Sequence, residues 1–517
     1  LARDRTNPEL MEGAVSSLLA LGEIQKAVPI AKAIEQLELR SQTVSMVLIA
    51  DLVMNQDFDG VIARAGDNGG IGPLVDTLVS AWAKLGQGQA AAAFEEFDVV
   101  AEQPGMSGFA TYHKAMAFAV VGDFEGANNL FSSSNADGAS ATRRGAMARA
   151  EVLSQLDRNA DAVQSLRLAF GDATDPELDA LLEALEAGTI VPFTHATSAS
   201  DGIAEVFYSL AGALRGEADA DYTLLYARLA YSLRPDHIDA LLLSAELLEE
   251  LDQFDLAIDA YKKVPRTDTA SHAAELGRAA ALRSSGKPDA AIEVLAQLAR
   301  RFPDMAIVHS TLGDALRNQD EFVDAVASYD RALELVPEGS RGRWFIHYAR
   351  AIAHERLDNW EQAEADFRAA LDLNPDHPQV LNYLGYSMVE KQINLAEALD
   401  MIERAVAARP DSGFIVDSLG WVLYRLGRYD EAVAHMERAV ELMAVDPVVN
   451  DHLGDVYWAV GRKREAEFQW SRALSFVDPT EVDGEADPDR MRRKLEIGLD
   501  AVLLEEGAEP LKVANDD

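Results

Sequence analysis

The pattern of apolar and polar positions in the C-terminal half of the chain repeats with a period of 34 residues. Two consecutive stretches, DSLGWVLYRLGRYDEAVAHMERAV from Asp417 and DHLGDVYWAVGRKREAEFQWSRAL from Asp451, restate each other by residue class. The aligned small residues are Gly420 with Gly454, Gly427 with Gly461, Ala432 with Ala466 and Ala439 with Ala473. Within each stretch the apolar residues recur at spacings of three and four, which is typical of amphipathic helices. We therefore expect each unit to be two short helices joined by a turn.

One template recurs upstream of these stretches. The template starts with Gly or Ala. Counted from this residue, an apolar or aromatic residue follows three positions later, Ala twelve positions later, a large residue sixteen positions later and Ala nineteen positions later, and Pro then ends the unit. Its copies are Gly313, Leu316, Ala325, Tyr329, Ala332, Pro337; Ala351, His354, Ala363, Phe367, Ala370, Pro375; and, with one inserted residue, Gly385, Met388, Ala398, Ile402, Ala405, Pro410. The small residue lets the paired helices approach, the large residue fills the gap between neighbouring units, and proline ends each unit because it cannot continue a helix. No unit can bury its apolar face alone, so the eight units expected from about Glu205 to Asp478 must stack.

The template also predicts how the chain is divided. Before Ala187 it is degenerate, and we expect about five further units there. The stretch GTIVPFTHATSASDG has no helical period and the composition of a loop, and GDNGGIGP, at 66–73, is a second break. The predicted organisation is degenerate helical repeats at 1–187, a linker loop at 188–202, a regular array at 203–478, and an acidic loop, a C-terminal capping helix and a disordered tail at 479–517.

The template resembles that of the tetratricopeptide repeat (TPR) family over more than half of the chain, from Glu205 to Asp478. The resemblance implies an all-α fold, namely a TPR-type α-solenoid in which helix-turn-helix repeats stack into a right-handed superhelix. It also implies a noncatalytic protein that binds partner proteins or peptides on its concave surface.

The net charge of the chain and its lack of cysteine disfavour several classes of function. The chain has 46 basic and 87 acidic residues, a net charge of -41. Such a field repels phosphate backbones and anionic lipids, which disfavours nucleic acid and direct membrane docking as targets; the alternative is that the charge only keeps a long molecule soluble. No cysteine is present, which removes disulfides and thiolate chemistry. No apolar run approaches the ~20 residues of a transmembrane segment. Because the chain starts at Leu1 and not at methionine, we expect a processed or trimmed product, with any signal peptide or lipid anchor upstream.

No catalytic, cofactor or metal site is predicted. The stretch SSGKPDA lacks the first glycine of a phosphate loop and has Pro288 in place of the hydroxyl residue, so we expect a turn there. His347 and His354 could share a helix face, but the sequence offers no third ligand. The carboxylates of the acidic loop lack the spacing of a calcium loop.

The family resemblance implies that the first helix of each unit lines the concave wall. On each first helix, the exposed residues would lie three positions before the Gly or Ala of the template and one, four and five positions after it. We call these residues the stripe. Aromatic side chains and arginine mixed with Asn and Asp are typical of a binding surface. The predicted partner-binding residues are Tyr348, Arg356, Asn382, Tyr386, Asp417, Trp421, Tyr424, Arg425, Asp451 and Trp458. The alternative for Trp421 and Tyr424 is packing against a neighbouring helix. Trp470 is expected to be structural, and a clamp for a terminal carboxylate is not expected because Asp417 stands where a cation would be needed.

A closer resemblance concerns the run from Asn382 to Arg462. The phrases LGY, DSLGWVLYR and HLGDVYW are similar to repeat proteins of Gram-negative bacterial envelopes, including the outer-membrane lipoprotein adaptors that bind carboxyl-terminal processing proteases and present cell-wall hydrolases to them. The resemblance implies an adaptor at the periplasmic face of the outer membrane, with a carboxyl-terminal processing protease and murein hydrolases as partners. The lipid-bearing cysteine of such adaptors is absent from this chain. The alternatives are a cytoplasmic assembly factor or cochaperone, and a noncatalytic subunit of an enzyme complex; the sequence does not predict the oligomeric state.

Overall fold

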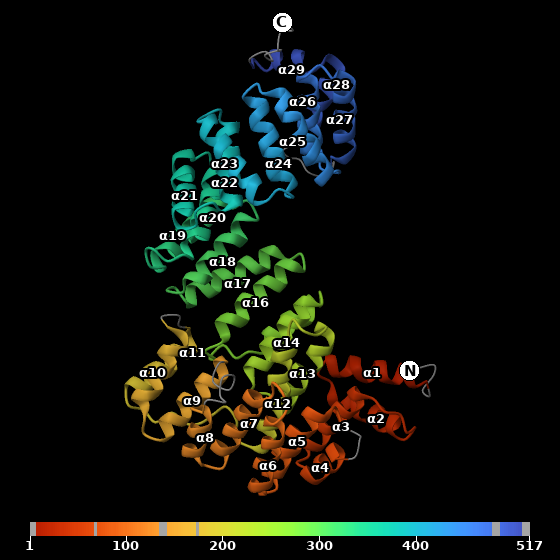
Figure 1. Ribbon diagram of the computed structural model, residues 1–517, viewed down its shortest axis with the longest axis vertical. Coiled ribbons are helices and arrows are strands. Elements are labelled where there is room, and N and C mark those ends of the chain that lie inside the picture. Colours follow the sequence, from red (N-terminus) through yellow and green to blue (C-terminus); the bar gives the residue numbers. More distant parts are fainter. Residues whose placement is uncertain (1–6, 67–69, 134–141, 172–174, 478–485, 509–517) are drawn as a thin grey trace. The chain divides into compact units, whose positions relative to one another are not determined.

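Helices form throughout the part of the chain that the structure describes. The computed structural model describes residues 7–66, 70–133, 142–171, 175–477 and 486–508. These ranges hold 29 α-helices and no β-strand (Figure 1). The contacts divide the chain into two compact units, Leu1–Arg301 (unit 1) and Phe302–Asp517 (unit 2).

The helices of unit 1 are α1 (Pro8–Ala20), α2 (Ile24–Glu35), α3 (Gln42–Met54), α4 (Phe58–Gly66), α5 (Pro73–Gly86), α6 (Ala90–Ala101), α7 (Ser107–Val120), α8 (Phe124–Phe131), α9 (Arg143–Gln155), α10 (Asn159–Phe170), α11 (Pro176–Glu186), α12 (Ala199–Leu214), α13 (Ala220–Leu233), α14 (Ile238–Glu250), α15 (Phe254–Tyr261), α16 (Ser271–Ser284) and α17 (Pro288–Arg301). Those of unit 2 are α18 (Ala306–Arg317), α19 (Phe322–Leu335), α20 (Arg343–Arg356), α21 (Trp360–Leu373), α22 (Pro378–Glu390), α23 (Leu395–Ala408), α24 (Gly413–Arg425), α25 (Tyr429–Leu442), α26 (Pro447–Ala459), α27 (Lys463–Phe476), α28 (Pro488–Ile497) and α29 (Leu499–Glu505).

The predicted helix pairs are present. Helices α12 to α27 form eight consecutive packed pairs, and α1 to α10 form five more. A glycine with positive φ lies two residues after the first helix in each of the two stretches compared above: Gly427 (76°) follows α24 and Gly461 (80°) follows α26. Glycine adopts this conformation without steric cost, which explains why it recurs there. The stretch SSGKPDA is the turn between α16 and α17, as predicted.

A close contact joins the two helices in the four pairs whose first helix carries the template glycine. A Cβ atom added to Gly454 would lie 2.4 Å from the ring of Trp470, and one added to Gly313 would lie 2.6 Å from the ring of Tyr329. The sequence interpretation placed the large residue between neighbouring units, but the structure shows that it also packs onto the glycine of its own unit. Trp470 is completely buried and donates a hydrogen bond from Nε1 to Asp455 Oδ1 at 2.9 Å, so its predicted structural role is confirmed.

In unit 1, two helices of the chain lie on the face that first helices of the N-terminal pairs share. Helix α12 packs against α5 and α7, and α13 packs against α1 and α3, all of which are first helices of their pairs (Figure 1). A Cβ atom on Gly202 would lie 2.2 Å from the ring of Trp82, which shows how closely α12 approaches α5. Arg228 Nε donates to the carbonyl oxygen of Ala20 at 2.9 Å. The face that these first helices share is therefore covered by α12 and α13.

A buried carboxylate ties this arrangement together. Glu205 of α12 is 1% exposed and accepts hydrogen bonds from Arg144 Nη2 (2.8 Å) and Tyr112 Oη (2.8 Å). Its Oε2 atom also lies 3.1 Å from His237 Nε2. Burial alone would raise the pKa of Glu205, but Arg144 and His237 outweigh it and hold this pKa well below its ordinary value.

The predicted linker at 188–202 is shorter than expected and is bound to the helices. Ser198 caps α12, which already begins at Ala199, so the last residues of the predicted loop are helical. The loop is held because the Glu151 carboxylate accepts hydrogen bonds from both the backbone N–H (2.8 Å) and the hydroxyl (2.7 Å) of Thr194.

The C-terminal cap also differs from the prediction of a single helix. Gly498, with φ of 83°, separates α28 from α29. The predicted acidic loop and disordered tail lie largely outside the described residues.

Replacing Gly454 with alanine tests the close contact. Gly454→Ala forces the Trp470 ring away from the helix, and overpacking of this kind costs about 1–3 kcal/mol. We expect a lower unfolding midpoint for unit 2 in denaturant titrations followed by circular dichroism. Gly342→Ala is the control within unit 2, because a Cβ atom there meets only Ser340 Oγ at 3.8 Å, an ordinary contact; an equal loss in both variants would contradict the packing argument.

Replacing Glu205 with glutamine tests the buried network. Glu205→Gln leaves the Arg144 guanidinium short of a negative partner, which we expect to lower the stability of unit 1 at pH 7 by about 3 kcal/mol. Because the folded-state pKa of Glu205 is depressed, its contribution is present above the unfolded-state pKa of about 4.3 and is lost as pH falls through the folded-state value. The difference in unfolding midpoint between the two proteins should therefore shrink below about pH 4. A difference that does not change with pH would overturn this assignment.

Candidate functional site

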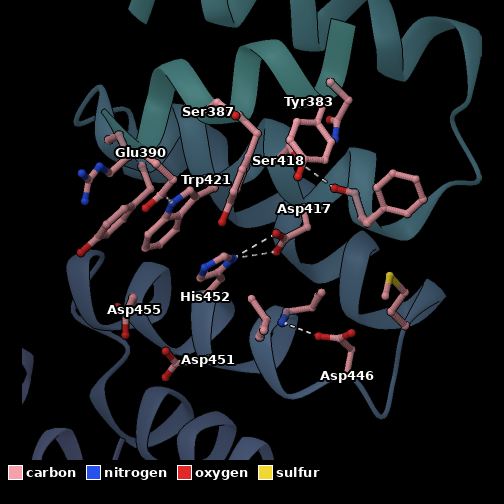
Figure 2. Close-up of a pocket in the computed structure, with 18 of the residues that line it drawn as sticks. Tyr383, Ser387, Glu390, Asp417, Ser418, Trp421, Asp446, Asp451, His452 and Asp455 are labelled. Carbon is pink, nitrogen blue, oxygen red and sulfur yellow. Dashed lines mark hydrogen bonds and ion pairs between the residues drawn. The ribbon is translucent and has the colours of Figure 1, made fainter. Parts of the chain in front are cut away.

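A cavity of about 800 Å³ opens on unit 2 along the first helices of its successive pairs. Its wall is formed by residues of α20, α22, α24 and α26, and α28 and α29 close one end through Arg490 and Leu503. Figure 2 shows side chains from α22, α24 and α26 pointing toward the same space. We call this cavity the groove.

Nine of the ten predicted partner-binding residues line the groove: Tyr348, Arg356, Asn382, Tyr386, Asp417, Trp421, Tyr424, Arg425 and Asp451. The stripe predicted from the repeat register is therefore one continuous surface. Its role in binding stays a prediction.

Trp458 does not line the groove. Its indole Nε1 donates to Asp500 Oδ2 at 2.9 Å, and its ring lies against Gly498 and 5.3 Å from the ring of Trp470. The break at Gly498 lets α29 cover Trp458, so this residue joins the cap to the array.

Trp421 and Tyr424 form the floor of the groove and are largely covered. They are only 8% and 7% exposed. The Trp421 ring stacks on His452, with centroids 3.9 Å apart, and on Tyr424, with centroids 4.8 Å apart. Its Nε1 atom donates to Glu390 Oε1 at 2.7 Å. The alternative of packing against a neighbouring helix is thus what the structure shows, and these two side chains are not exposed anchors.

An ion pair lies beneath this floor. His452 Nδ1 is 3.0 Å from Asp417 Oδ2 and 3.2 Å from Asp417 Oδ1 (Figure 2). Burial alone would lower the pKa of His452, but the carboxylates of Asp417, Asp451 and Asp455 outweigh it and raise this pKa above its ordinary value. The imidazole therefore holds a proton more readily than a free histidine does, and it pairs with Asp417 across two repeats.

A buried lysine attaches the cap beside the end of the groove. The Lys494 side chain of α28 is 0% exposed, and its Nζ atom donates to Asp451 Oδ2 at 2.8 Å and to Asp455 Oδ1 at 2.6 Å. Burial raises the pKa of Asp451 even though Lys494 partly offsets the effect. The cap is thus attached to the inner face of α26 by a desolvated cation between two carboxylates.

The accessible part of the groove is its rim. Arg356 and Glu390 are exposed, and Tyr348, Tyr386 and Arg425 are partly exposed. Asn382 is 8% exposed, and its carboxamide oxygen has no hydrogen-bond partner among the described residues.

The sequence interpretation missed groove residues one helical turn before the predicted stripe. Tyr383, Ser418 and His452 lie two positions before the template glycine, and Phe414 lies six positions before it. Residues three and four positions apart lie on the same face of a helix, so these residues share the face of the predicted stripe. Extending the stripe by one turn toward the start of each helix would have found them.

Of the two histidines considered for a metal site, His347 is bound to a carboxylate of its own repeat. His347 Nδ1 lies 2.8 Å from Asp366 Oδ1. Among the described residues, no three His, Cys, Asp or Glu side chains are grouped so that they could hold a metal ion. Nor is any helix in the described ranges both long enough and apolar enough to span a bilayer.

Comparison with known families gives one result. The tetratricopeptide repeat family matches at residues 239–267, 276–340, 348–413 and 417–443. These ranges overlap α20, α22 and α24, three of the four first helices that line the groove, and do not reach α26.

Individual proteins carry the same repeats. A TPR repeat-containing protein of Pseudomonas aeruginosa is 30% identical over 188 residues, which is 36% of this chain and only about a third (31%) of that protein. The tetratricopeptide repeat protein 36 homolog of Drosophila melanogaster is 32% identical over 132 residues, 24% of this chain and 69% of that protein. The crystal structure of the APC/C hetero-tetramer Cut9-Hcn1 covers 90% of this chain and 98% of its own chain at 15% identity, with a TM-score of 0.42, a similarity too low to inform function. The repeat matches and the well-covered Drosophila relative show that this chain belongs to the tetratricopeptide repeat family.

Proposed function

We propose that the chain is a noncatalytic adaptor that holds a segment of a partner protein in the groove of unit 2. TPR arrays are protein-interaction scaffolds, and the observation that carries the proposal is the groove itself. Its volume of about 800 Å³ falls in the range of ligand-binding clefts, and it runs along four successive first helices.

Unit 1 offers no comparable surface on its first helices α1, α3, α5 and α7. Helices α12 and α13 already cover the face that these helices share. Binding at that face would require the chain to give up the Glu205 network and the packing of Trp82 against Gly202. The proposal therefore assigns binding to unit 2.

The rim supplies the kind of side chains that dominate binding energy. Tyr348, Tyr386, Arg356 and Arg425 line the groove and keep part of their surface accessible. Tyrosine and arginine are enriched among the residues that contribute most to protein interfaces. The stacked floor below them is rigid, so little conformational entropy is lost when a partner binds.

The proposal extends to a cellular role as an envelope adaptor. The likeness of the run from Asn382 to Arg462 to Gram-negative envelope repeat proteins supports a place at the periplasmic face of the outer membrane. The partners would be a carboxyl-terminal processing protease and murein hydrolases. An array that holds two such proteins at once raises the effective concentration of one beside the other, which is how an adaptor promotes cleavage without catalysing it.

Substitutions on the rim test the groove. We expect Arg356→Ala combined with Tyr386→Ala to weaken partner binding about thirtyfold or more, because truncating one anchor residue costs ~2 kcal/mol. Binding would be measured by biolayer interferometry on the partner identified by cross-linking. Helicity and melting temperature should stay unchanged, since neither side chain is fully buried. The matched control is Phe468→Ala on α27, where an aromatic side chain is 64% exposed and outside the groove; equal losses in the two variants would place the contact elsewhere.

The cellular role is tested by affinity capture from envelope extracts followed by mass spectrometry. We expect the intact chain to recover a processing protease or a murein hydrolase, and the Arg356→Ala, Tyr386→Ala variant to lose it. Recovery of cytosolic chaperones alone would overturn the envelope assignment.

A further inference from the structure

We infer that the groove selects a positively charged polypeptide segment, with a lysine ammonium donating to the carboxamide oxygen of Asn382. This inference rests on the proposed function, since it names the chemistry of the partner that the same groove binds. Three observations carry it: a position that recurs in three repeats, an acceptor atom without a donor, and an excess of carboxylates around it.

The recurring position lies three residues before the template glycine. It is Asp451 before Gly454, Asp417 before Gly420, and Asn382 before Gly385. All three side chains line the groove, so the repeat geometry presents them in the same way on α26, α24 and α22.

Two of the three positions already hold a nitrogen donor. Asp451 accepts two hydrogen bonds from the Lys494 ammonium, at 2.9 Å and 2.8 Å. Asp417 pairs with the imidazole of His452 at 3.0 Å (Figure 2). The chain's own cap thus shows that a lysine side chain can lie on this face, fully desolvated and bound by this position.

The third position lacks its donor. Asn382 is more than nine-tenths buried, and its Oδ1 atom has no hydrogen-bond partner among the described residues. An unsatisfied buried acceptor is unfavourable, so a donor supplied by a partner would be strongly preferred there. The pattern in α24 and α26 indicates that the donor is a cationic nitrogen.

The surrounding charge fits a cation. Seven carboxylates and three guanidinium groups line the groove. Internal partners neutralise Asp417, Asp451 and Asp455. In the described part of the chain, no ion pair joins the lining carboxylates Glu355, Glu390 and Asp446 to a cation. The partly exposed ring of Tyr386 adds cation–π attraction for an ammonium or guanidinium that enters.

The test uses a short fluorescein-labelled peptide in which lysine alternates with alanine, titrated with the full chain and followed by fluorescence anisotropy. A matched peptide has glutamate in place of every lysine. We expect the lysine peptide to bind and the glutamate peptide not to bind, and we expect the affinity to fall with added salt.

Substitutions at Asn382 separate a specific acceptor from general attraction. Asn382→Leu keeps the side-chain size and removes the acceptor, so we expect binding of the lysine peptide to weaken about tenfold. Asn382→Asp recreates the aspartate of the next two repeats, and we expect it to bind the peptide about tenfold more tightly, because hydrogen bonds to a charged acceptor are stronger.

Substitution of the buried Asn382 risks misfolding, so a second set of variants changes the charges of the groove lining instead. The groove variant Glu355→Gln, Glu390→Gln, Asp446→Asn removes three charges but keeps the shapes, and the amide oxygens can still accept from Trp421 Nε1 and the Val449 N–H. We expect it to weaken binding about tenfold. The control variant Glu334→Gln, Glu441→Gln, Glu467→Gln removes the same charge from exposed positions outside the groove and should change the affinity less than twofold.

The outcomes divide cleanly. Equal binding of the glutamate peptide would overturn the inference, because the charge of the peptide would then not decide binding. Equal weakening by the groove and control variants would also overturn it, and would leave only the field of a chain with net charge -41 as the source of attraction. If the lysine peptide fails to bind while Arg356→Ala with Tyr386→Ala still abolishes partner capture, the groove binds a partner of different chemistry and the proposed function stands. If peptide binding persists but the rim substitutions do not affect partner capture, the proposed function fails.

Discussion

The contact between a small residue on the first helix and a large residue on the second helix is the constraint on which the rest of the structure depends. Where the small residue is Gly454, the Trp470 ring lies where a Cβ atom would otherwise be, so the two helices can meet at only one depth and rotation. The same contact recurs between Gly420 and Met436. Because this contact recurs in four pairs of unit 2, its first helices turn equivalent positions toward one surface. The groove is a consequence of this repetition.

Features that arise within one repeat could be predicted from the sequence. The helix pairs, the positive φ at Gly427 and the burial of Trp470 depend on residues within a single unit. Features that depend on the next unit could not. The sequence left open whether Trp421 is an accessible binding residue or packs against a neighbouring helix. It is covered, because His452 of the following repeat stacks on its ring. Trp458 is covered by a cap that lies beyond the last repeat and carries no periodic signal.

Contacts between segments that are far apart in the chain could not be predicted from the 34-residue repeat either. Helices α12 and α13 obey the same repeat pattern as their neighbours, yet they lie on first helices of much earlier pairs, namely α1, α3, α5 and α7. The signal for this is a single buried acid, Glu205, whose partners Arg144 and Tyr112 come from two other helices. An isolated charged residue inside an apolar helix face indicates such a partner, but not where in the chain the partner lies.

The choice of side chain at one repeated position explains how an array of similar units acquires a specific site. A buried carboxylate is tolerated where a cation is always present, as Lys494 is for Asp451 and His452 is for Asp417. A carboxylate at the position of Asn382 would be left unpaired whenever the groove is empty, which would cost several kcal/mol. A neutral amide carries a much smaller penalty when unpaired. An amide therefore suits Asn382, the one position of the three at which the donor belongs to a partner that binds and dissociates.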